Sequence, residues 1–377
     1  MEKIKLGIIG TGQIIHDAYL PIMPFLKNID EIRLYDLDYN SPKNIINEFQ
    51  IWLQKGVFKK EYSHYFSDAH KKAEDFYKKL RVVEEEELIN SSNTILITTP
   101  PATHIDLAIK CSEYNKDIIL EKPLAVSIEE IESLPLKIQE KLKKNVRYLE
   151  NFIFNPAYRE LKNKINSGQI GDILLLETCL ANTGPSQYED KPFWRISKNE
   201  GGGALLDWGP HTIALSLYLA GLDKEIKEIK TKYINFSQPN EKIAGKEITA
   251  KIDLDSLINI ILSSRDNTIT NLLIENSWKN NSNIKSPQGR SWIRVEGTLG
   301  SYMIEIIKNK SSKEYHLTYN QRRGISQTEI LPIQFPHDSF YYGLKTIFES
   351  EILPEYCTFD FGLNILKIIN KILKQEK

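Results

Sequence analysis

This sequence of 377 residues has only three cysteines, no long apolar run and almost no excess of either charge. The three cysteines are odd in number and widely spaced, which argues against a disulfide framework and a cysteine-based zinc site. The 49 basic and 50 acidic residues leave a net charge of −1 and no positive field to attract nucleic acid or anionic lipid. No stretch approaches the roughly 18 apolar residues of a membrane-spanning helix, and no signal-peptide cleavage site follows the start. We expect a cytoplasmic protein with no metal, nucleic-acid or membrane partner.

The first part of the sequence alternates apolar strands with helical patterns. Lys5–Gly10 is an apolar, β-branched run ended by glycine, and residues 13–26 can follow as a helix. Further strands are expected at Ile32–Asp36, residues 94–99 and Asp117–Leu120. Because strands that alternate with helices form parallel sheets, this half predicts an α/β, doubly wound parallel sheet.

After about residue 150 strands follow one another with little helix between them. Helices are expected near 155–166 and 207–220, and the C-terminal spacing of Leu363 to Leu373 predicts a helix that buries an apolar stripe and can pack back on the N-terminal part. The expected strands are Ile248–Ile252, Ile258–Leu262, Ile269–Leu273 and Trp292–Val295. The length corresponds to roughly 2.5 average domains. We therefore expect a domain at 1–125 and a second, α+β domain at 126–377 with a large, mostly antiparallel open sheet.

Residues 41–80 are rich in lysine and aromatic side chains and contain His64 and His70. A metal or partner site in this segment is one interpretation. A solvated helical excursion is the interpretation that we favour.

A glycine pattern, Gly10-Thr-Gly12-Gln-Ile-Ile15, follows the first expected strand and precedes the first expected helix. In that setting the first glycine permits a tight turn and the second lets the backbone approach a pyrophosphate, with helix N–H groups facing the anion. Asp36 follows at roughly the 20-residue spacing at which a carboxylate meets the adenosine ribose. No basic residue stands beside it to hold a 2′-phosphate, so the sequence favours NAD(H) over NADP(H).

Two further strand ends carry polar residues, and the carboxyl ends of parallel strands face the cofactor crevice. Thr98, Thr99 and Pro100 end one strand, and His104 either lines the crevice or simply sits in the first turn of the next helix. Glu121-Lys122-Pro123 follows the next strand, where Pro123 keeps Lys122 extended and able to reach a substrate oxygen; an ordinary surface lysine is the alternative. The candidate cofactor-binding residues are Gly10, Thr11, Gly12, Gln13, Ile14, Asp36, Thr98, Thr99, Pro100, His104, Glu121 and Lys122.

The glycine run Gly201–Gly203 leads into a helical pattern that carries Asp207 and His211 at positions i and i+4. The two side chains therefore share one helix face, where histidine can transfer a proton and aspartate can orient it. A helix cap with a buried histidine is the alternative. Trp194 and Arg195 precede the glycine run, and the Trp194 ring could stack on a sugar or a nicotinamide. The candidate substrate-binding residues are Lys122, Asn182, Trp194, Arg195, Asp207 and His211.

Taken in order, six segments resemble the Gfo/Idh/MocA oxidoreductases: GIIGTGQII, ITTPPATHIDLAIKC, LEKPLAV, NPAYRELKNKINSGQIGDI, GGGALLDWGPHTIALSLYLAG and IRVEGTLGSY. The resemblance implies a Rossmann domain that binds NAD(P) and a C-terminal domain whose open sheet often joins subunits, so a homodimer or homotetramer is expected. It also implies hydride transfer to or from a secondary hydroxyl or ketone of a sugar, cyclitol or nucleotide sugar. Lys122, Asp207 and His211 match the family's catalytic positions. Redox-neutral elimination or glycoside hydrolysis, and a non-catalytic dinucleotide sensor, are the alternative functions on this fold.

The sequence departs from the family pattern at four places. Ile15 stands where the family has a small residue, Ala214 replaces a frequent aspartate, and Asn151–Phe154 replaces an Asn-Arg-Arg-Phe-like segment, which removes possible cationic contacts to an acidic substrate. The stretch between Asp36 and Thr94 is longer than usual. The catalytic positions are all retained.

Overall fold

The computed structural model describes residues 3–181, 194–238, 241–243, 246–247, 251–278, 291–308, 313–322, 324, 326–331 and 334–375. The chain forms two compact units. The first contains Met1–Ala125, Glu129–Asn155 and Gln334–Leu363, and the second contains Val126–Ile128, Pro156–Ile333 and Asn364–Lys377. Residues 129–155 and 334–363 thus join the first unit, beyond the expected boundary at residue 125. The cofactor-binding and substrate-binding roles of the two domains stay predictions.

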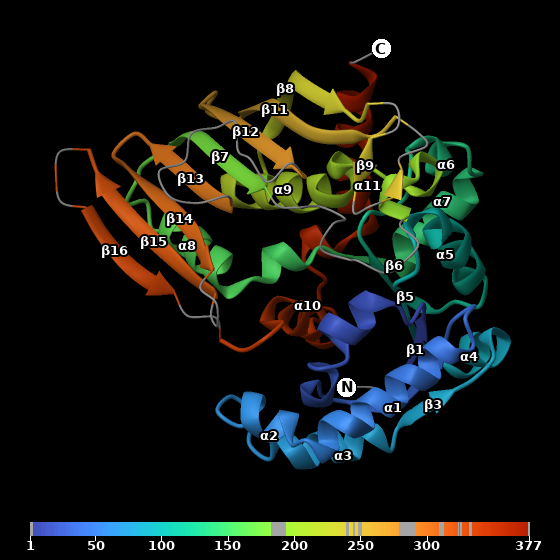
Figure 1. The fold of residues 1–377 in the computed structure, drawn as a ribbon. Helices are drawn as coiled ribbons and strands as arrows, with labels where there is room; N and C mark the ends of the chain where they lie inside the picture. The colour runs from blue at the N-terminus through green and yellow to red at the C-terminus, as the bar shows by residue number, and fades with distance from the viewer. Residues whose placement is uncertain are drawn as a thin grey trace. The chain divides into compact units, whose positions relative to one another are not determined.

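The first unit contains a six-stranded parallel sheet in the order β3-β2-β1-β4-β5-β6 (Figure 1). Its strands are β1 (Ile4–Ile9), β2 (Ile29–Tyr35), β3 (Leu80–Val82), β4 (Thr94–Ile97), β5 (Asp117–Glu121) and β6 (Val146–Leu149). Its α-helices are α1 (Asn40–Gln54), α2 (Val57–Tyr62), α3 (Ala69–Tyr77), α4 (Glu85–Ser91), α5 (His104–Glu113), α6 (Glu129–Glu132), α7 (Leu136–Asn145) and α10 (Asp338–Glu349). This strand order confirms the predicted doubly wound sheet.

The prediction of one helix over residues 13–26 is wrong in its length. The chain forms a short π-helical turn at Ile15–Tyr19 and then a 3₁₀ turn at Met23–Phe25. Pro21 lacks the N–H that would continue the helix, although Leu20 before it still has helical backbone angles. The bulky Ile15 side chain is fully buried in the core beside the sheet.

The lysine- and aromatic-rich segment folds into α1, α2 and α3, which agrees with the expected helices, but most of its aromatic residues are buried or half-buried rather than solvated. Its aromatic rings are packed together: Phe49 lies 5.0 Å from Phe58 and 5.3 Å from Phe76 between ring centroids. His64 is exposed, and the His70 imidazole lies 3.6 Å from Glu74. The segment therefore enlarges the core of the first unit, which explains its aromatic composition.

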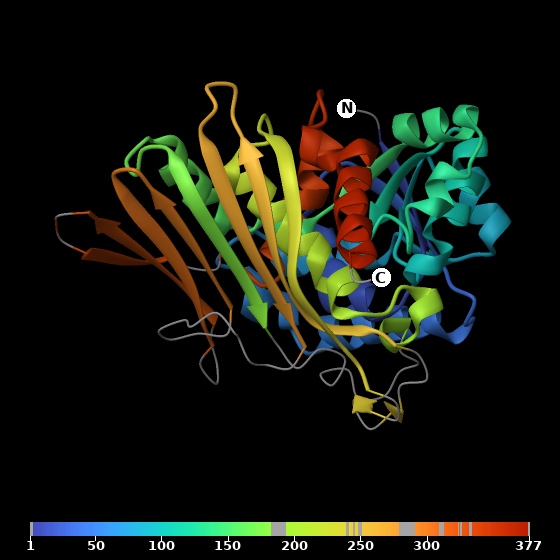
Figure 2. The same cartoon turned by 90° about the horizontal axis from the view of Figure 1, so that it is seen from above.

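The second unit contains an eight-stranded sheet in the order β16-β15-β14-β13-β7-β12-β11-β8, which Figure 2 shows with its strands side by side. Its strands are β7 (Ile173–Ala181), β8 (Glu225–Phe236), β11 (Asp253–Ser263), β12 (Ile269–Ser277), β13 (Ser291–Gly297), β14 (Gly300–Lys308), β15 (Lys313–Gln321) and β16 (Ser326–Leu331). A separate pair is β9 (Lys242–Ile243) with β10 (Lys246–Glu247). Only the β7–β12 pair of the large sheet is parallel, so the mostly antiparallel prediction is confirmed.

Three of the four strands expected in this unit lie within β11, β12 and β13. Of the fourth, residues 248–250 lie outside the described residues, and Lys251 and Ile252 precede β11 without forming a strand. Helix α9 (Ala204–Ala220) packs across β7, β11 and β12. Helix α8 (Pro156–Asn166) precedes β7 in sequence. The predicted C-terminal helix is α11 (Phe359–Lys374), and its buried Ile369 lies against α9. In the part of the chain that the structure describes, no helix is long and apolar enough to cross a membrane.

Candidate active site

The glycine turn after β1 has the geometry that each glycine was expected to provide. Gly10 has φ +91°, and a Cβ atom there would lie 2.8 Å from the backbone nitrogen of Thr99. Gly12 has open space where a Cβ would stand. Gln13 and Ile14 begin the helical turn, where N–H groups lack an intrahelical acceptor. The turn can therefore receive a phosphate group close to the backbone, as the pyrophosphate hypothesis requires.

Asp36 lies directly after β2 and faces this turn. Its Oδ2 accepts the backbone N–H of Thr11 at 2.6 Å and the Thr11 hydroxyl at 3.2 Å, and its Oδ1 accepts the N–H of Asp38 at 3.0 Å. Leu37 follows and is 90% exposed. Because a carboxylate has about four acceptor sites, Asp36 can hold the turn and still accept ribose hydroxyls.

The ends of β4 and β5 are tied together by a buried histidine. The imidazole of His104 contacts the carbonyl oxygens of Thr99 at 2.9 Å and Pro123 at 2.7 Å. Burial lowers the pKa of His104 to about 4, although both carbonyls favour the protonated ring. His104 occupies the first turn of α5 and is 1% exposed. In the structure its imidazole connects the loop after β4 to the loop after β5. Nearby, the Thr98 hydroxyl donates to the carbonyl of Gly10 at 2.6 Å.

Lys122 follows β5, and the peptide bond between it and Pro123 is cis. The Glu121 carboxyl group before it is buried; it accepts the backbone N–H of Lys122 at 3.0 Å and the Tyr19 hydroxyl. Burial raises the pKa of Glu121 to about 7, since it outweighs the opposing contributions of Tyr19 and Lys122. Tyr19 belongs to the π-helical turn after the glycines. The fold thus connects the glycine turn to the backbone of the candidate lysine through one carboxyl group.

In the second unit, the glycine run shapes the start of α9. Gly201 and Gly203 have φ values of +94° and +120°. A Cβ on Gly202 would lie 2.6 Å from the carbonyl oxygen of Arg195, and the N–H of Gly203 donates to that same oxygen at 3.0 Å. The run therefore folds tightly back on the segment that carries Trp194 and Arg195.

Asp207 and His211 lie on α9 as predicted, and both are buried, at 5% and 6% exposure. The guanidinium of Arg195 donates from Nε to Oδ2 of Asp207 at 3.2 Å and stacks 4.5 Å from the Trp194 ring centre. The ring of Trp208 lies 5.7 Å from that of His211. The second unit therefore brings Trp194, Arg195 and Asp207 together beside a buried imidazole on the same helix.

Sequence reasoning missed Asp253, the first residue of β11. Its Oδ2 accepts the backbone N–H of Leu205 at 2.6 Å and so satisfies a donor in the first turn of α9. Burial raises the pKa of Asp253 to about 6, in spite of that hydrogen bond. A Cβ on Gly203 would collide with this carboxylate at 2.1 Å, so the glycine makes room for it. No local motif links residues this far apart, although two aspartates, Asp253 and Asp255, at the start of an apolar strand were a visible signal.

Two other sequence observations have clear outcomes. Asn182 lies outside the described residues. The Asn151–Phe154 segment forms a 3₁₀ turn in which Ile153 and Phe154 are fully buried. This departure from the family pattern therefore supplies core packing in the first unit.

Together, the parallel sheet with its glycine turn and the open sheet crossed by α9 define a class of two-part dinucleotide-binding oxidoreductases. The pattern "Oxidoreductase family, NAD-binding Rossmann fold" matches residues 4–148, and "GFO/IDH/MocA C-terminal domain" matches residues 158–303. The chain belongs to the Gfo/Idh/MocA oxidoreductase family, whose N-terminal domain is an NAD(P)-binding Rossmann domain.

Curated relatives are distant. The chain is 31% identical over 132 residues to scyllo-inositol 2-dehydrogenase (NAD(+)) of Bacillus subtilis (strain 168), a match to 35% of this chain and 36% of that protein. It is 22% identical to Glucose-6-phosphate 3-dehydrogenase of the same organism over 93% of this chain and 87% of the relative.

Solved structures share the fold along the whole chain. KijD10, described as a 3-ketoreductase from Actinomadura kijaniata in complex with NADP and TDP-benzene, has a TM-score of 0.64 at 16% identity and covers 99% of this chain and 98% of its own. A super-repressor mutant of Gal80p from Saccharomyces cerevisiae has a TM-score of 0.72 at 16% identity, with 99% and 96% covered. At this identity the likeness concerns the fold.

Proposed function

We propose that the protein is an NAD(P)-dependent oxidoreductase that transfers hydride between a nicotinamide and a secondary hydroxyl or ketone of a sugar, cyclitol or nucleotide sugar. The observation that carries the proposal is the retained set of family positions: Lys122 at the end of β5, and the buried Asp207 and His211 on one face of α9. The relatives named as inositol and glucose-6-phosphate dehydrogenases support this class of substrate.

The first unit fits a bound dinucleotide. Gly10 allows the tight turn against Thr99, Gly12 leaves open space for a pyrophosphate, and Asp36 stands directly after β2 to accept ribose hydroxyls. When bound, the nicotinamide supplies or accepts the hydride. We propose NAD(H) as the preferred form, because a 2′-phosphate would face the Asp36 carboxylate.

The chain's own residues would handle the substrate oxygen and its proton. His211 would accept the hydroxyl proton during oxidation and return it during reduction. Lys122 would stabilise negative charge that develops on the same oxygen. Asp207, held by Arg195 at 3.2 Å, would orient the imidazole or bind a neighbouring hydroxyl, and the Trp194 ring would stack on the sugar.

The test is nicotinamide absorbance at 340 nm, recorded with NAD and NADP against cyclitols, aldoses, uronic acids and nucleotide sugars. Reduced cofactor formed with one substrate class, and lost in His211→Gln, is the expected result. If NADH binds but no substrate yields a signal in either direction, redox-neutral elimination or a sensor replaces the dehydrogenase.

We also propose that the large sheet joins subunits into a dimer or tetramer. The sheet face opposite α9 carries the half-buried side chains Leu175, Leu257, Ile261 and Leu273, which are diagonal neighbours on three strands and alternate there with polar residues. Light scattering after gel filtration should give a multiple of 43.6 kDa for the native chain and a smaller species for Leu273→Lys. A native monomer at micromolar concentration would refute this assembly.

A further inference from the structure

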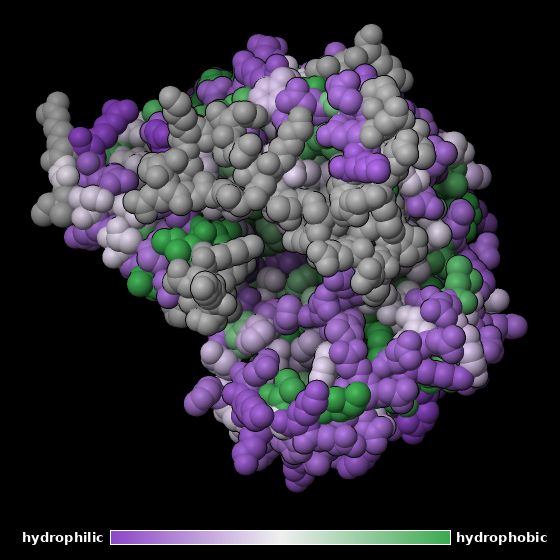
Figure 3. Space-filling model, in the orientation of Figure 1, coloured by the Kyte–Doolittle hydropathy of each residue, from purple (hydrophilic) through white to green (hydrophobic). Residues whose placement is uncertain are grey.

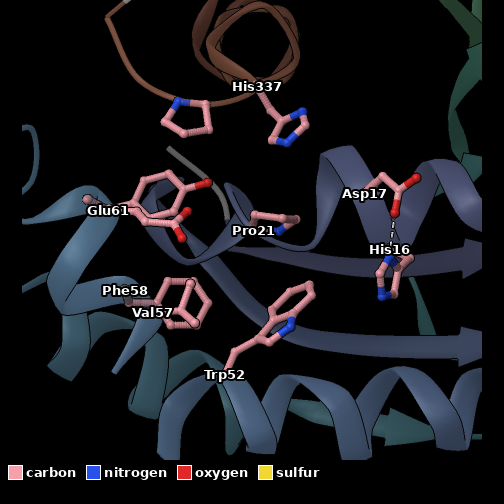
Figure 4. A pocket seen from close by; sticks show the side chains of 10 residues that line it. His16, Asp17, Pro21, Trp52, Val57, Phe58, Glu61 and His337 are labelled. Carbon is pink, nitrogen blue, oxygen red and sulfur yellow. Dashed lines mark hydrogen bonds and ion pairs between the residues drawn. The ribbon is translucent and has the colours of Figure 1, made fainter. Parts of the chain in front are cut away.

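A pocket of about 480 Å³ opens in the first unit, at the side of the lysine- and aromatic-rich segment (Figure 4). It is lined by His16, Asp17, Pro21, Trp52, Val57, Phe58, Glu61, Tyr62, Pro336 and His337. They come from the turn after the glycines, from α1 and α2, and from the residues before α10. None of them belongs to the proposed cofactor or substrate site. The volume falls within the roughly 300–1,000 Å³ typical of small-molecule sites.

The floor of the pocket is aromatic and apolar. Figure 4 shows the Trp52 ring and Pro21 facing the same space as Phe58 and Val57. The rings are held by their neighbours: Trp52 lies 6.4 Å from Phe58 in an edge-on arrangement, and Phe58 lies 6.0 Å from Tyr62. Phe58 and Tyr62 are almost fully buried and Trp52 is half-buried. A ligand would therefore meet the ring of Trp52, which the buried Phe58 helps to hold in place, and a held ring reduces the ordering cost of binding.

The charged groups of the pocket are predominantly acidic. Its described lining includes the carboxylates of Asp17 and Glu61 and no lysine or arginine. His16 bridges two carboxylates, with Nδ1 2.5 Å from Asp17 and Nε2 2.5 Å from Glu48. Burial opposes charge on this ring, but the hydrogen bonds and charges of Asp17 and Glu48 raise the pKa of His16. The lining thus holds two carboxylates, Asp17 and Glu61, beside the imidazoles of His16 and His337, and Glu48 outside the lining adds a third carboxylate next to His16.

We propose that this pocket binds an organic cation, in which an ammonium group is carried on an apolar or aromatic body. The ammonium would lie near Glu61, and the body would lie against the half-buried Trp52 and Pro21. Aromatic faces attract cations through their quadrupole, and a carboxylate adds a charge-assisted hydrogen bond. An anion would meet net negative charge, and a neutral molecule of the same shape would gain the apolar contact alone.

Figure 3 shows the surface over the helices α1–α3 in the orientation of Figure 1. The visible face over α1–α3 is mostly hydrophilic, with a small apolar group among the charged side chains. An open apolar floor within a polar rim is the usual form of a site for a small amphipathic molecule. The site would also give the helical segment α1–α3, inserted between β2 and β3, a function in addition to core packing.

The experiment uses the full chain and three probes with a phenyl body: 2-phenylethylamine, 2-phenylethanol and 3-phenylpropanoate. Binding is measured by titration calorimetry and saturation-transfer NMR at about 20 mM and 150 mM salt. The amine should bind saturably with a Kd of about 1 mM or below, at least about fivefold more tightly than the alcohol. Its affinity should fall at the higher salt, because the attraction is screened.

Two variants and a matched control locate the binding. Glu61→Gln should weaken the amine at least about fivefold and leave the alcohol unchanged, while Trp52→Leu should weaken both. Glu86→Gln, an exposed glutamate on α4 outside the pocket, should change neither. No saturable binding of the amine, equal binding of amine and alcohol, tighter binding of the anion, or no response to Glu61→Gln would each overturn the proposal. Circular dichroism confirms that the variants are folded.

Discussion

In each unit a buried carboxyl group accepts a backbone N–H at a candidate site element: Lys122 in the first unit and the start of α9 in the second. The first carboxyl group belongs to the preceding residue, and the second belongs to a distant strand. Glu121 precedes Lys122 in sequence and accepts its backbone N–H at 3.0 Å. Asp253 lies on β11 and accepts the Leu205 N–H of α9 at 2.6 Å. The N-cap residue of α9 is Gly203, which has no side chain to accept the first N–H groups of the helix, so the acceptor comes from a distant strand.

The comparison also concerns charge. Burial raises the pKa of Glu121 to about 7 and that of Asp253 to about 6. Tyr19 and Lys122 lower the pKa of Glu121 and the Glu150 carboxylate raises it, whereas the carboxylates of Asp207 and Asp255 both raise the pKa of Asp253 further. The charge of Glu121 is therefore partly balanced by Lys122. The charge of Asp253 adds to those of two other carboxylates and is partly balanced by the positive end of the α9 dipole.

The largest expected effect tests the group that Glu121 supports. Lys122→Ala should lower kcat about 10³-fold, or about 4 kcal/mol of transition-state stabilisation, and change the Kd for NADH by less than about threefold. Steady-state kinetics and tryptophan quenching measure the two quantities. Lys137→Ala on α7 is the exposed control and should retain activity. Undiminished turnover in Lys122→Ala would remove this lysine from the mechanism.

A pH titration of stability tests Glu121 itself. The pKa of Glu121 in the folded chain is about 7, above the ordinary value of 4.5. Between these two pH values the folded chain keeps a proton on Glu121 that the unfolded chain has released. This group's contribution to the free energy of unfolding should therefore decrease as pH rises from about 4.5 to 7, by an amount on the order of 3 kcal/mol. Urea unfolding at pH 5 to 8 should show a steeper decline for the native chain than for Glu121→Gln. Equal slopes would show that Glu121 titrates normally.

Removal of the helix-start acceptor should have a smaller effect on stability. Asp253→Ala leaves the Leu205 N–H without its acceptor and should cost about 1–2 kcal/mol of unfolding free energy. Since α9 carries Asp207 and His211, kcat should fall more than KM changes. Asp253→Asn keeps an acceptor oxygen and should recover most of both losses. If Ala and Asn behave alike, the hydrogen bond is not what positions α9.

The difference between a neighbouring and a distant hydrogen-bond acceptor also explains how much of the structure could be predicted from the sequence. The parallel sheet and the positions of Lys122, Asp207 and His211 followed from periodicity and short motifs, because neighbouring residues determine them. The helix over 13–26 failed where Pro21 ended it, a local signal that the apolar pattern outweighed. Asp253 and the Tyr19–Glu121 contact bring together distant segments, and only the folded chain shows such pairs.

The smallest expected effect concerns cofactor choice at the glycine turn. Asp36→Ser removes the carboxylate that we expect to meet the ribose and to oppose a 2′-phosphate. The ratio of NADPH to NADH dissociation constants should fall about tenfold, which corresponds to about 1.4 kcal/mol. Asp38→Ser, two residues further on and exposed, is the matched control and should keep the native ratio. Because Asp36 also accepts the Thr11 N–H at 2.6 Å, NADH affinity itself should weaken as the turn loosens. A ratio that stays constant in Asp36→Ser would place the discrimination between the two cofactors elsewhere in the first unit.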